Sequence, residues 1–228
     1  MGSKGHRSGD KEKDRMELAL VRTASRPEDL GGQSDEDLIG LVDKGNDRAF
    51  EILVERYKAP ILNFLYRMLG DSDTCEDLTQ ETLIRVYRNA GRYKRIAKFS
   101  TWIYTIAANL GKNELRNRSR RAGITWDDIQ NYNLKTDDSA PMRVRPVRTD
   151  GAIERSELRV ALDQAIRSLP ARFRTPFVLR DVEGFAYEEI AKMLKLPKGT
   201  VKSRINRARL RFKEYLEENF EDVFEYRS

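Results

Sequence analysis

Residues 187–209 read YEEIAKMLKLPKGTVKSRINRAR, and this stretch decides the fold of the C-terminal part of the chain. Its first eight residues have the spacing of an amphipathic helix, and Pro197 and Gly199 predict a short turn after it. Thr200 is a favourable N-cap for a second helix. That helix places four apolar residues on one face: Val201, Ile205, Ala208 and Phe212. The stretch therefore predicts two helices joined by a tight turn.

The other faces of the second helix carry polar and basic side chains: Lys202, Ser203, Arg204, Asn206, Arg207 and Arg209. In a helix-turn-helix, the second helix enters the major groove of DNA with its N-terminal end first. Arg and Lys bind guanine edges or phosphates, and Asn pairs with adenine. The pattern predicts a DNA-binding helix-turn-helix, with an ordinary basic surface helix as the alternative.

The charges of the 228-residue chain are separated into blocks, although its net charge is only +6. Lys192–Lys213 contain nine basic residues and no acidic one, whereas Glu214–Glu225 contain six acidic residues and no basic one. Asp71–Glu81 are acidic, and Lys112–Arg121 are mostly basic. A single block of this kind is typical of a solvated helix face, so the surrounding motifs must decide its role.

Composition excludes several classes of protein. The single cysteine, Cys75, excludes an intrachain disulfide and a multi-cysteine zinc site, and the single histidine, His6, lies in a polar N-terminal stretch. We therefore expect no metal, no cofactor and no enzymatic activity. The N-terminus is too charged for a signal peptide, and no apolar run is long enough to cross a membrane, so a cytoplasmic protein is expected.

The rest of the chain reads as all-α, with two small helical domains joined by a flexible linker. Ser34 and Asp37 resemble an N-cap and its acidic partner. A strong helical pattern follows over Phe50–Leu69, interrupted by Pro60. In the second domain a helix near Ile153 stops at Pro170, and further helices are expected around 176–181, 187–194 and 200–215. The boundaries are a disordered tail over 1–33, a first domain over 34–121, a linker over 122–150 and a second domain over 151–228.

Three segments of the second domain and two of the first resemble one family. Residues 177–184 (FVLRDVEG), 187–191 (YEEIA) and 199–204 (GTVKSR) are similar to region 4 of bacterial sigma factors of the extracytoplasmic-function (ECF) group. Residues 77–87 (DLTQETLIRVY) resemble the region 2 helix that binds RNA polymerase, and residues 99–107 (FSTWIYTIA) resemble the promoter-melting helix. Finding both in this order is far more specific than finding either.

The resemblance implies a sigma factor that binds core RNA polymerase, recognises the minus 35 and minus 10 promoter elements and promotes DNA opening. Its implied partners are promoter DNA, the beta-prime coiled coil and beta subunit of the polymerase, and an anti-sigma factor, with no small-molecule substrate and no membrane insertion. The implied minus 35 residues are Thr200, Lys202, Ser203, Arg204, Asn206, Arg207 and Arg209.

The residues implied to bind or melt the minus 10 element are Tyr93, Phe99, Ser100, Trp102, Lys112, Asn113 and Arg116. The aromatic side chains could stack on unpaired bases, although Phe99 and Trp102 could equally be core anchors. The implied polymerase-binding residues are Asp77, Gln80, Glu81 and Arg85. For Glu81 and Arg85 a local i,i+4 ion pair is the alternative.

The chain departs from the family pattern at three positions. Ala186 stands where a Ser often caps the first helix of the motif. Gly111 and Glu114 stand in the basic helix after the promoter-melting segment, where better helix formers or neutral residues are expected. The linker's acidic pairs and arginines fit a segment that threads the polymerase cleft, but a solvated spacer would look the same.

Two other functions compete with this interpretation. The acidic run 71–77 begins like a calcium loop, but it lacks the turn glycine and has Cys75 at a ligand position; a helix N-terminus explains it better. A conventional repressor would have a ligand-binding or receiver domain before its helix-turn-helix, and residues 77–87 do not resemble one. A redox role for Cys75 remains an alternative to a buried thiol.

Overall fold

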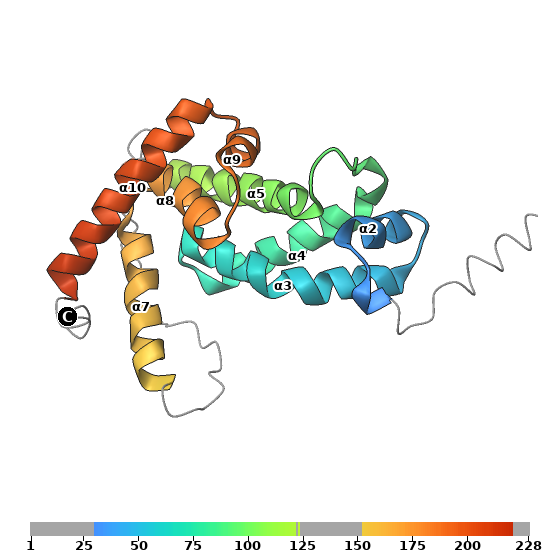
Figure 1. The fold of residues 1–228 in the computed structure, drawn as a ribbon, viewed down its shortest axis with the longest axis horizontal. Helices are drawn as coiled ribbons and strands as arrows, with labels where there is room; N and C mark the ends of the chain where they lie inside the picture. The colour runs from blue at the N-terminus through green and yellow to red at the C-terminus, as the bar shows by residue number, and fades with distance from the viewer. Residues whose placement is uncertain (1–29, 122, 124–151, 221–228) are drawn as a thin grey trace, which may run out of the picture.

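The computed structural model describes residues 30–121, 123 and 152–220, and all of its regular elements there are helical (Figure 1). The elements are η1 (Leu30–Gly32), α2 (Asp35–Asp43), α3 (Asp47–Leu69), α4 (Ser72–Arg88), η2 (Ala90–Arg92), α5 (Phe99–Arg121), α7 (Ala152–Ser168), α8 (Ala171–Phe177), η3 (Val178–Val182), α9 (Tyr187–Leu194) and α10 (Lys198–Asn219). The all-α prediction is confirmed for this part of the chain. Residues 1–29 of the predicted tail and nearly all of the linker lie outside it, whereas Leu30–Gly32, also placed in that tail, form η1. The domain boundaries stay a prediction.

The helices of the first half begin at side-chain caps. Ser34 Oγ accepts a hydrogen bond from the Asp37 amide (3.2 Å), as predicted, and Asp71 Oδ1 accepts one from the Thr74 amide (2.7 Å). Such caps satisfy amides that have no partner within the helix. Helix α3 continues through Pro60, which therefore does not end it.

Gly111 allows α5 to lie close to α3. A Cβ atom at this position would lie 2.9 Å from Met68 Cε and 3.3 Å from Leu65 Cδ2. These distances are shorter than ordinary van der Waals contacts, so a side chain at this position would push the two helices apart. Glycine costs about 1 kcal/mol of helix propensity relative to alanine, but it allows the two helices to pack more closely. The sequence showed only the cost at this position.

The second half contains the predicted helix-turn-helix, with two corrections to its helix starts. Helix α8 begins at Ala171 and contains Pro176, which was expected to start a helix; it continues into the π-helical turn η3. Helix α10 begins at Lys198, so Thr200 lies in its first turn and is not the N-cap. The N-cap is Pro197, whose fixed φ suits the residue before a helix. Helix α10 also ends at Asn219, beyond the predicted end at residue 215.

The missing cap at Ala186 is offset by Glu189. The Ala186 amide donates to Glu189 Oε2 (2.9 Å), while the same carboxylate accepts a hydrogen bond from Thr101 Oγ1 of α5 (2.9 Å). Glu189 therefore stabilises the start of α9 and ties it to the first half of the chain.

Two positions in the second half should respond oppositely to substitution. Lys195 ends α9 with φ 54°, and Gly184 has φ 80°; both are exposed and left-handed. Since this conformation costs roughly 1 kcal/mol for a side chain with a Cβ, we expect Lys195→Gly to stabilise the protein by about that amount and Gly184→Ala to destabilise it similarly. Thermal denaturation measures both. A lower melting temperature for Lys195→Gly would contradict the assignment of this turn.

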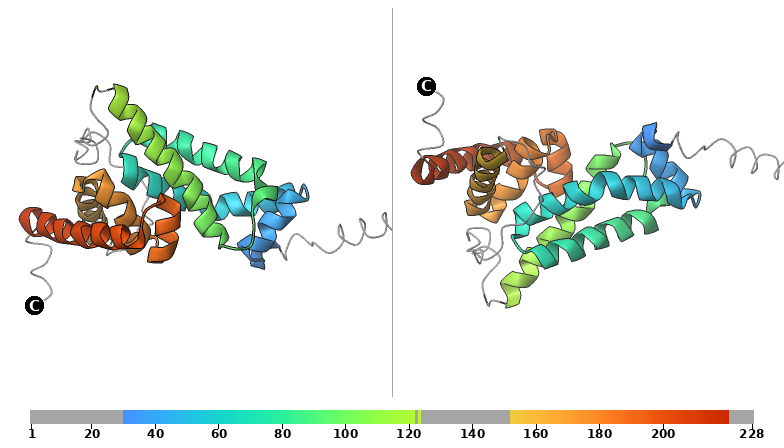
Figure 2. Two further views of the ribbon diagram at one scale, coloured as in Figure 1. Left: turned by 90° about the horizontal axis from the view of Figure 1, so that it is seen from above. Right: turned by 90° about the horizontal axis from the view of Figure 1, so that it is seen from below.

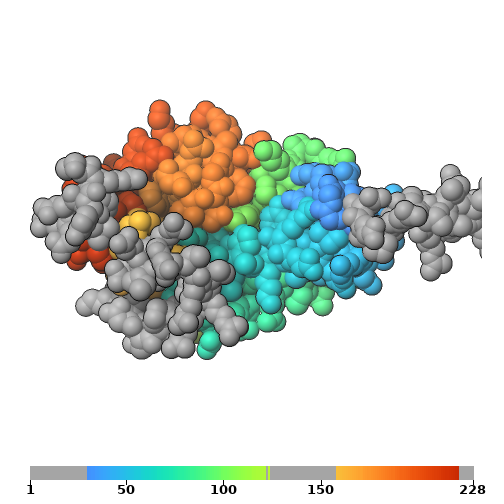
Figure 3. All heavy atoms as spheres, turned by 60° about the horizontal axis from the view of Figure 1, so that its bottom comes forward, coloured from blue at the N-terminus to red at the C-terminus, as the bar shows by residue number. Residues whose placement is uncertain are grey.

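The two halves pack against each other along what we call the seam, where α3 and α5 contact α7, α8 and α9. In Figure 2 the second half lies beside α3 and α5, and Figure 3 shows their atoms in contact. One continuous apolar core includes residues of both halves. The predicted organisation into two domains gave no indication of this contact.

Candidate nucleic-acid interface

The first three turns of α10 present the predicted recognition surface. Val201, Ile205 and Ala208 are fully buried, as the apolar pattern predicted. The residues on the opposite side are exposed: Lys202, Ser203, Asn206 and Arg207. Two cations, an amide and a hydroxyl thus face solvent within about two helical turns, which gives donors for both phosphates and base edges.

Two other arginines predicted to hold DNA are already engaged. Arg209 Nη2 donates to Asp181 Oδ1 (2.5 Å) and its Nε donates to Asp181 Oδ2 (3.0 Å), which raises the arginine pKa. Arg204 is half-buried at the seam, where burial and then the charge of Arg172 lower its pKa. Thr200 is half-buried in the first turn of α10. Thr200 and Arg204 are therefore less accessible in this arrangement than the exposed four, whereas Arg209 is exposed but already paired with Asp181.

The aromatic residues predicted for the minus 10 element gather at the start of α5. Phe99 is fully buried, and its ring packs edge-on against Tyr57 with 5.1 Å between centroids. The Tyr93 and Trp102 rings lie 5.4 Å apart and are only half-buried. Of the two alternatives for Phe99, the structure favours a core anchor, because no face of its ring is open to a base. Tyr93 and Trp102 keep accessible surface.

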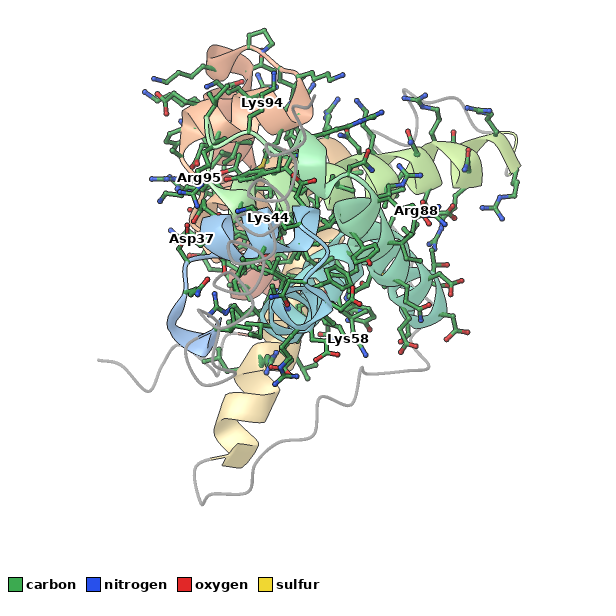
Figure 4. The ribbon with its side chains drawn as sticks, turned by 90° about the vertical axis from the view of Figure 1, so that its right-hand side faces the viewer. Asp37, Lys44, Lys58, Arg88, Lys94 and Arg95 are labelled. Carbon is green, nitrogen blue, oxygen red and sulfur yellow. The ribbon has the colours of Figure 1, made fainter. Side chains whose placement is uncertain are left out.

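The loop between η2 and α5 forms an exposed basic edge at the end of the molecule. Lys94, Arg95 and Lys98 are exposed, and Ile96 is 89% exposed. Figure 4 shows Arg95 close to Asp37 of α2, with Lys94 farther from it. Asp37 accepts a hydrogen bond from Ser34 and is paired with Arg95, and these two contacts, in that order, lower the pKa of its carboxyl.

The basic residues further along α5 form a separate group. Lys112, Asn113 and Arg116 are exposed, but Arg116 is about 24 Å along the helix from Ser100. The predicted minus 10 set is therefore spread along one helix. Glu114, which was unexpected here, accepts hydrogen bonds from Arg118 (3.0 Å) and Arg121 (2.9 Å) and orders the basic end of α5.

The residues predicted to bind polymerase lie on the outer face of α4. Asp77, Gln80 and Arg85 are exposed, and Arg85 Nε donates to Glu81 Oε1 (2.6 Å). The local ion pair offered as the alternative thus exists. Sequence reasoning missed Ile84, which is 42% exposed between them. The sequence feature that could have indicated it is an apolar residue four positions after Gln80, on a helix face that is otherwise polar.

The acidic run at the start of α4 does not form a metal site. Asp71 is the helix N-cap, and among the residues described no three His, Cys, Asp or Glu side chains are grouped as ligands. Cys75 is fully buried, and burial raises the pKa of its thiol to about 12. This pKa favours the buried-thiol interpretation, because the reactive form is the thiolate.

The seam is held by polar contacts that sequence reasoning did not anticipate. Tyr104 Oη donates to Glu183 Oε2 (2.5 Å), and Arg67 Nε donates to Asp163 Oδ1 (3.1 Å). Burial raises the pKa of Glu183. Arg174 is 1% exposed, and its Nη1 donates to the Met68 carbonyl (2.9 Å) across the seam.

Comparison with known proteins matches both halves. A model described as sigma-70 region 2 matches residues 53–121, and one described as sigma-70, region 4 matches residues 159–212. The RNA polymerase sigma-H factor of Pseudomonas aeruginosa is 37% identical over 187 residues, covering 79% of this chain and 92% of that protein. The ECF RNA polymerase sigma-E factor of Haemophilus influenzae is 36% identical over 180 residues, covering 77% and 92%.

Two solved structures share the fold. The sigma factor RpoE of Bartonella quintana, in complex with the anti-sigma factor NepR, has a TM-score of 0.56 at 24% identity and covers 75% of this chain and 98% of its own. CnrH in complex with the cytosolic domain of CnrY has a TM-score of 0.56 at 21% identity, covering 82% and 99%. No helix within residues 30–121 and 152–220 is both long and apolar enough to span a membrane. The chain belongs to the ECF RNA polymerase sigma factors.

Proposed function

We propose that the chain recognises the minus 35 element through α10, contacts and opens the minus 10 element through α5 and the loop before it, and binds core RNA polymerase through α4. The exposed polar and basic side chains on the first turns of α10 carry this proposal: Lys202, Ser203, Asn206 and Arg207. The chain itself catalyses no reaction, because its contribution is selective binding. It acts in the cytoplasm, where the polymerase and the chromosome are.

At the minus 10 element, the half-buried Tyr93 and Trp102 offer stacking surfaces and Ser100 offers a hydroxyl group. A base that leaves the duplex gains roughly 1–3 kcal/mol from such stacking. Lys112, Asn113 and Arg116 bind the backbone further along α5. Phe99 packs against both rings from the core and does not itself contact a base.

At the polymerase, the outer face of α4 combines charges with the exposed Ile84. Arg85→Ala should weaken binding to core polymerase about tenfold, since a hydrogen bond between charged groups contributes roughly 1.5–3 kcal/mol. Its effect on stability should be only about 0.3–0.5 kcal/mol, the contribution of an exposed i,i+4 pair. Binding to labelled core enzyme measures the first effect and urea denaturation the second.

Arg48 provides the matched control, because it forms a comparable exposed ion pair with Glu51 (2.5 Å) on α3. Arg48→Ala should leave polymerase binding unchanged. If Arg48→Ala and Arg85→Ala weaken binding equally, α4 is not the docking surface.

The halves must separate before both promoter elements are bound. The two elements lie some 25 base pairs apart, or about 85 Å at 3.4 Å per base pair. In the structure, Lys112 of the minus 10 set and Arg204 of the minus 35 set line the same cavity. The packed arrangement is thus a closed form, and promoter binding requires that the seam opens.

Tyr104→Phe should shift this equilibrium toward the open form about tenfold or more, because it removes a hydrogen bond to the buried Glu183 carboxylate across the seam. Tyr57→Phe is the control. It removes an equally short bond to Asp35 (2.5 Å) within the first half, so it should cost stability without opening the seam.

Fluorescence energy transfer between dyes at Asp73→Cys and Glu217→Cys measures the opening. Both positions are exposed, whereas Cys75 is buried and stays unlabelled. Equal transfer efficiencies for the two tyrosine variants would contradict a role of Tyr104 at the seam.

A protein partner that stabilises the closed form would keep the factor inactive. Both structural relatives are described in complex with another protein, the anti-sigma factor NepR for RpoE and the cytosolic domain of CnrY for CnrH. We therefore expect an anti-sigma factor for this chain as well. Binding of that factor should keep the seam closed.

A further inference from the structure

A cavity of about 130 Å³ lies at the seam between the two halves. Its walls are mainly apolar: Met68, Ala108 and Leu115 belong to the first half, and Pro176, Leu194 and Leu196 belong to the second. A dry cavity of about 150 Å³ admits a molecule the size of benzene. The space is therefore suited to an apolar group of about six carbon atoms.

Every ionisable residue that lines the cavity is a cation: Lys112, Arg172 and Arg204. Among the residues that the structure describes, no carboxylate forms an ion pair with any of the three. Neighbouring cations on the same helices are paired, since Arg118 contacts Glu114 and Arg209 contacts Asp181. The positive charge at the cavity is therefore not balanced by the described part of the protein.

Two further observations indicate that this charge lacks a partner. The Arg172 Nε atom is buried, and no described group forms a hydrogen bond with it. Burial and the nearby Arg172 charge both disfavour the charged form of Arg204. An anion in the cavity would relieve both effects, because a buried charge is costly unless it is paired or fully hydrogen-bonded.

We propose that this cavity binds a small amphipathic monoanion, a carboxylate of about six carbon atoms in all, and that the bound ligand holds the two halves closed. The apolar body occupies the space between Met68 and Leu194, and the carboxylate is held by the three cations. The second part rests on the proposed function: Lys112 and Arg204 are DNA contacts from different halves, so an occupied cavity withholds both from the promoter.

Isothermal titration of the free chain with hexanoate tests the site without polymerase or DNA, so its outcome is independent of sigma activity. We expect saturable binding with one hexanoate per chain. Acetate and inorganic phosphate lack the apolar body, and 1-hexanol lacks the charge, so each should bind at least about tenfold more weakly. Equal affinity for 1-hexanol or phosphate, or no saturable hexanoate binding, would overturn the proposal.

Two variants locate the binding. Arg172→Gln removes a cation that is outside the proposed DNA-binding set and should weaken hexanoate binding about tenfold. Ala171→Leu fills the cavity and should abolish saturable binding while the chain stays folded by circular dichroism. Arg159→Gln, on the exposed side of α7, is the matched control and should change the affinity less than about twofold. If Arg172→Gln and Ala171→Leu both bind hexanoate as tightly as the Arg159→Gln control, the ligand binds elsewhere and the proposal fails.

The closing effect is measured with the dye pair at positions 73 and 217. Hexanoate should raise the transfer efficiency of the Tyr104→Phe variant, which starts more open, and should not do so when Ala171→Leu is added. Binding without any change in transfer would refute the closing effect and leave the site intact. Neither the hexanoate titration nor the energy-transfer measurement contains polymerase or DNA, so a failure of the proposed sigma function would not affect either result.

Discussion

Arg174→Ala is expected to lower the free energy of unfolding by about 3–5 kcal/mol, the largest effect of any single change proposed here. The guanidinium is almost wholly buried and has no carboxylate partner among the described residues. It donates instead to the carbonyls of Arg167 (2.6 Å), Leu169 (2.7 and 3.0 Å) and Met68 (2.9 Å). Burial lowers its pKa to about 9, which still leaves it charged at neutral pH.

These carbonyls lie at the ends of α7 and α3, where the last turns lack partners within the helix and carry partial negative charge. Arg174 thus satisfies two helix C-termini with one side chain, and its removal leaves several buried acceptors without a donor. Urea denaturation measures the loss. Arg174→Lys should recover part of the stability, because an ammonium group supplies the charge but not the planar fork of donors.

Arg159→Ala is the control for the same change of charge at an exposed position of α7, and it should cost less than about 0.5 kcal/mol. If Arg174→Ala lowers the free energy of unfolding as little as Arg159→Ala does, the carbonyls that Arg174 binds are hydrated in the folded state, and Arg174 does not stabilise the seam.

Arg207→Ala is expected to reduce affinity for minus 35 DNA by about 10- to 100-fold, as a bidentate base contact contributes roughly 1–3 kcal/mol. Arg207 is exposed on the third turn of α10 and forms no ion pair within the described part of the chain, so its donors are available. Fluorescence anisotropy with a labelled promoter fragment at fixed salt measures the change.

Lys213→Ala is the matched control, because it removes the same charge about 9 Å further along α10. Lys213 is exposed, and among the described residues it pairs with Glu217 alone (3.2 Å). Its loss should weaken binding less than about threefold, through general electrostatics alone. Equal losses from the two variants would mean that α10 attracts DNA by charge without recognising its sequence.

The local features were predictable where one segment determines them. The cap at Ser34 and the buried face of Val201, Ile205 and Ala208 follow from spacing and side-chain chemistry within a few residues. The same reasoning misplaced the start of α10, because Thr200 is a good capping residue and Pro197 is an equally suitable residue before a helix. A helix start at Lys198 and one after Thr200 are both compatible with the local sequence, and residue propensities do not distinguish between them.

The seam could not be predicted, because it depends on contacts between residues far apart in sequence. Tyr104 and Glu183 are separated by 79 positions, and Arg174 and Met68 by 106. A buried arginine that binds only carbonyls leaves no acidic partner in the sequence to suggest a pair. For Phe99, the motif predicted an aromatic residue correctly, but only packing distinguishes a core anchor from a stacking platform.

The central claim, that this chain directs RNA polymerase to promoters, is tested most directly by run-off transcription with purified core enzyme and a panel of promoter fragments. We expect a promoter-dependent transcript that requires the chain, persists with Lys213→Ala and falls strongly with Arg207→Ala and Arg85→Ala. A chain that gives no promoter-dependent transcript and does not bind core polymerase would contradict it.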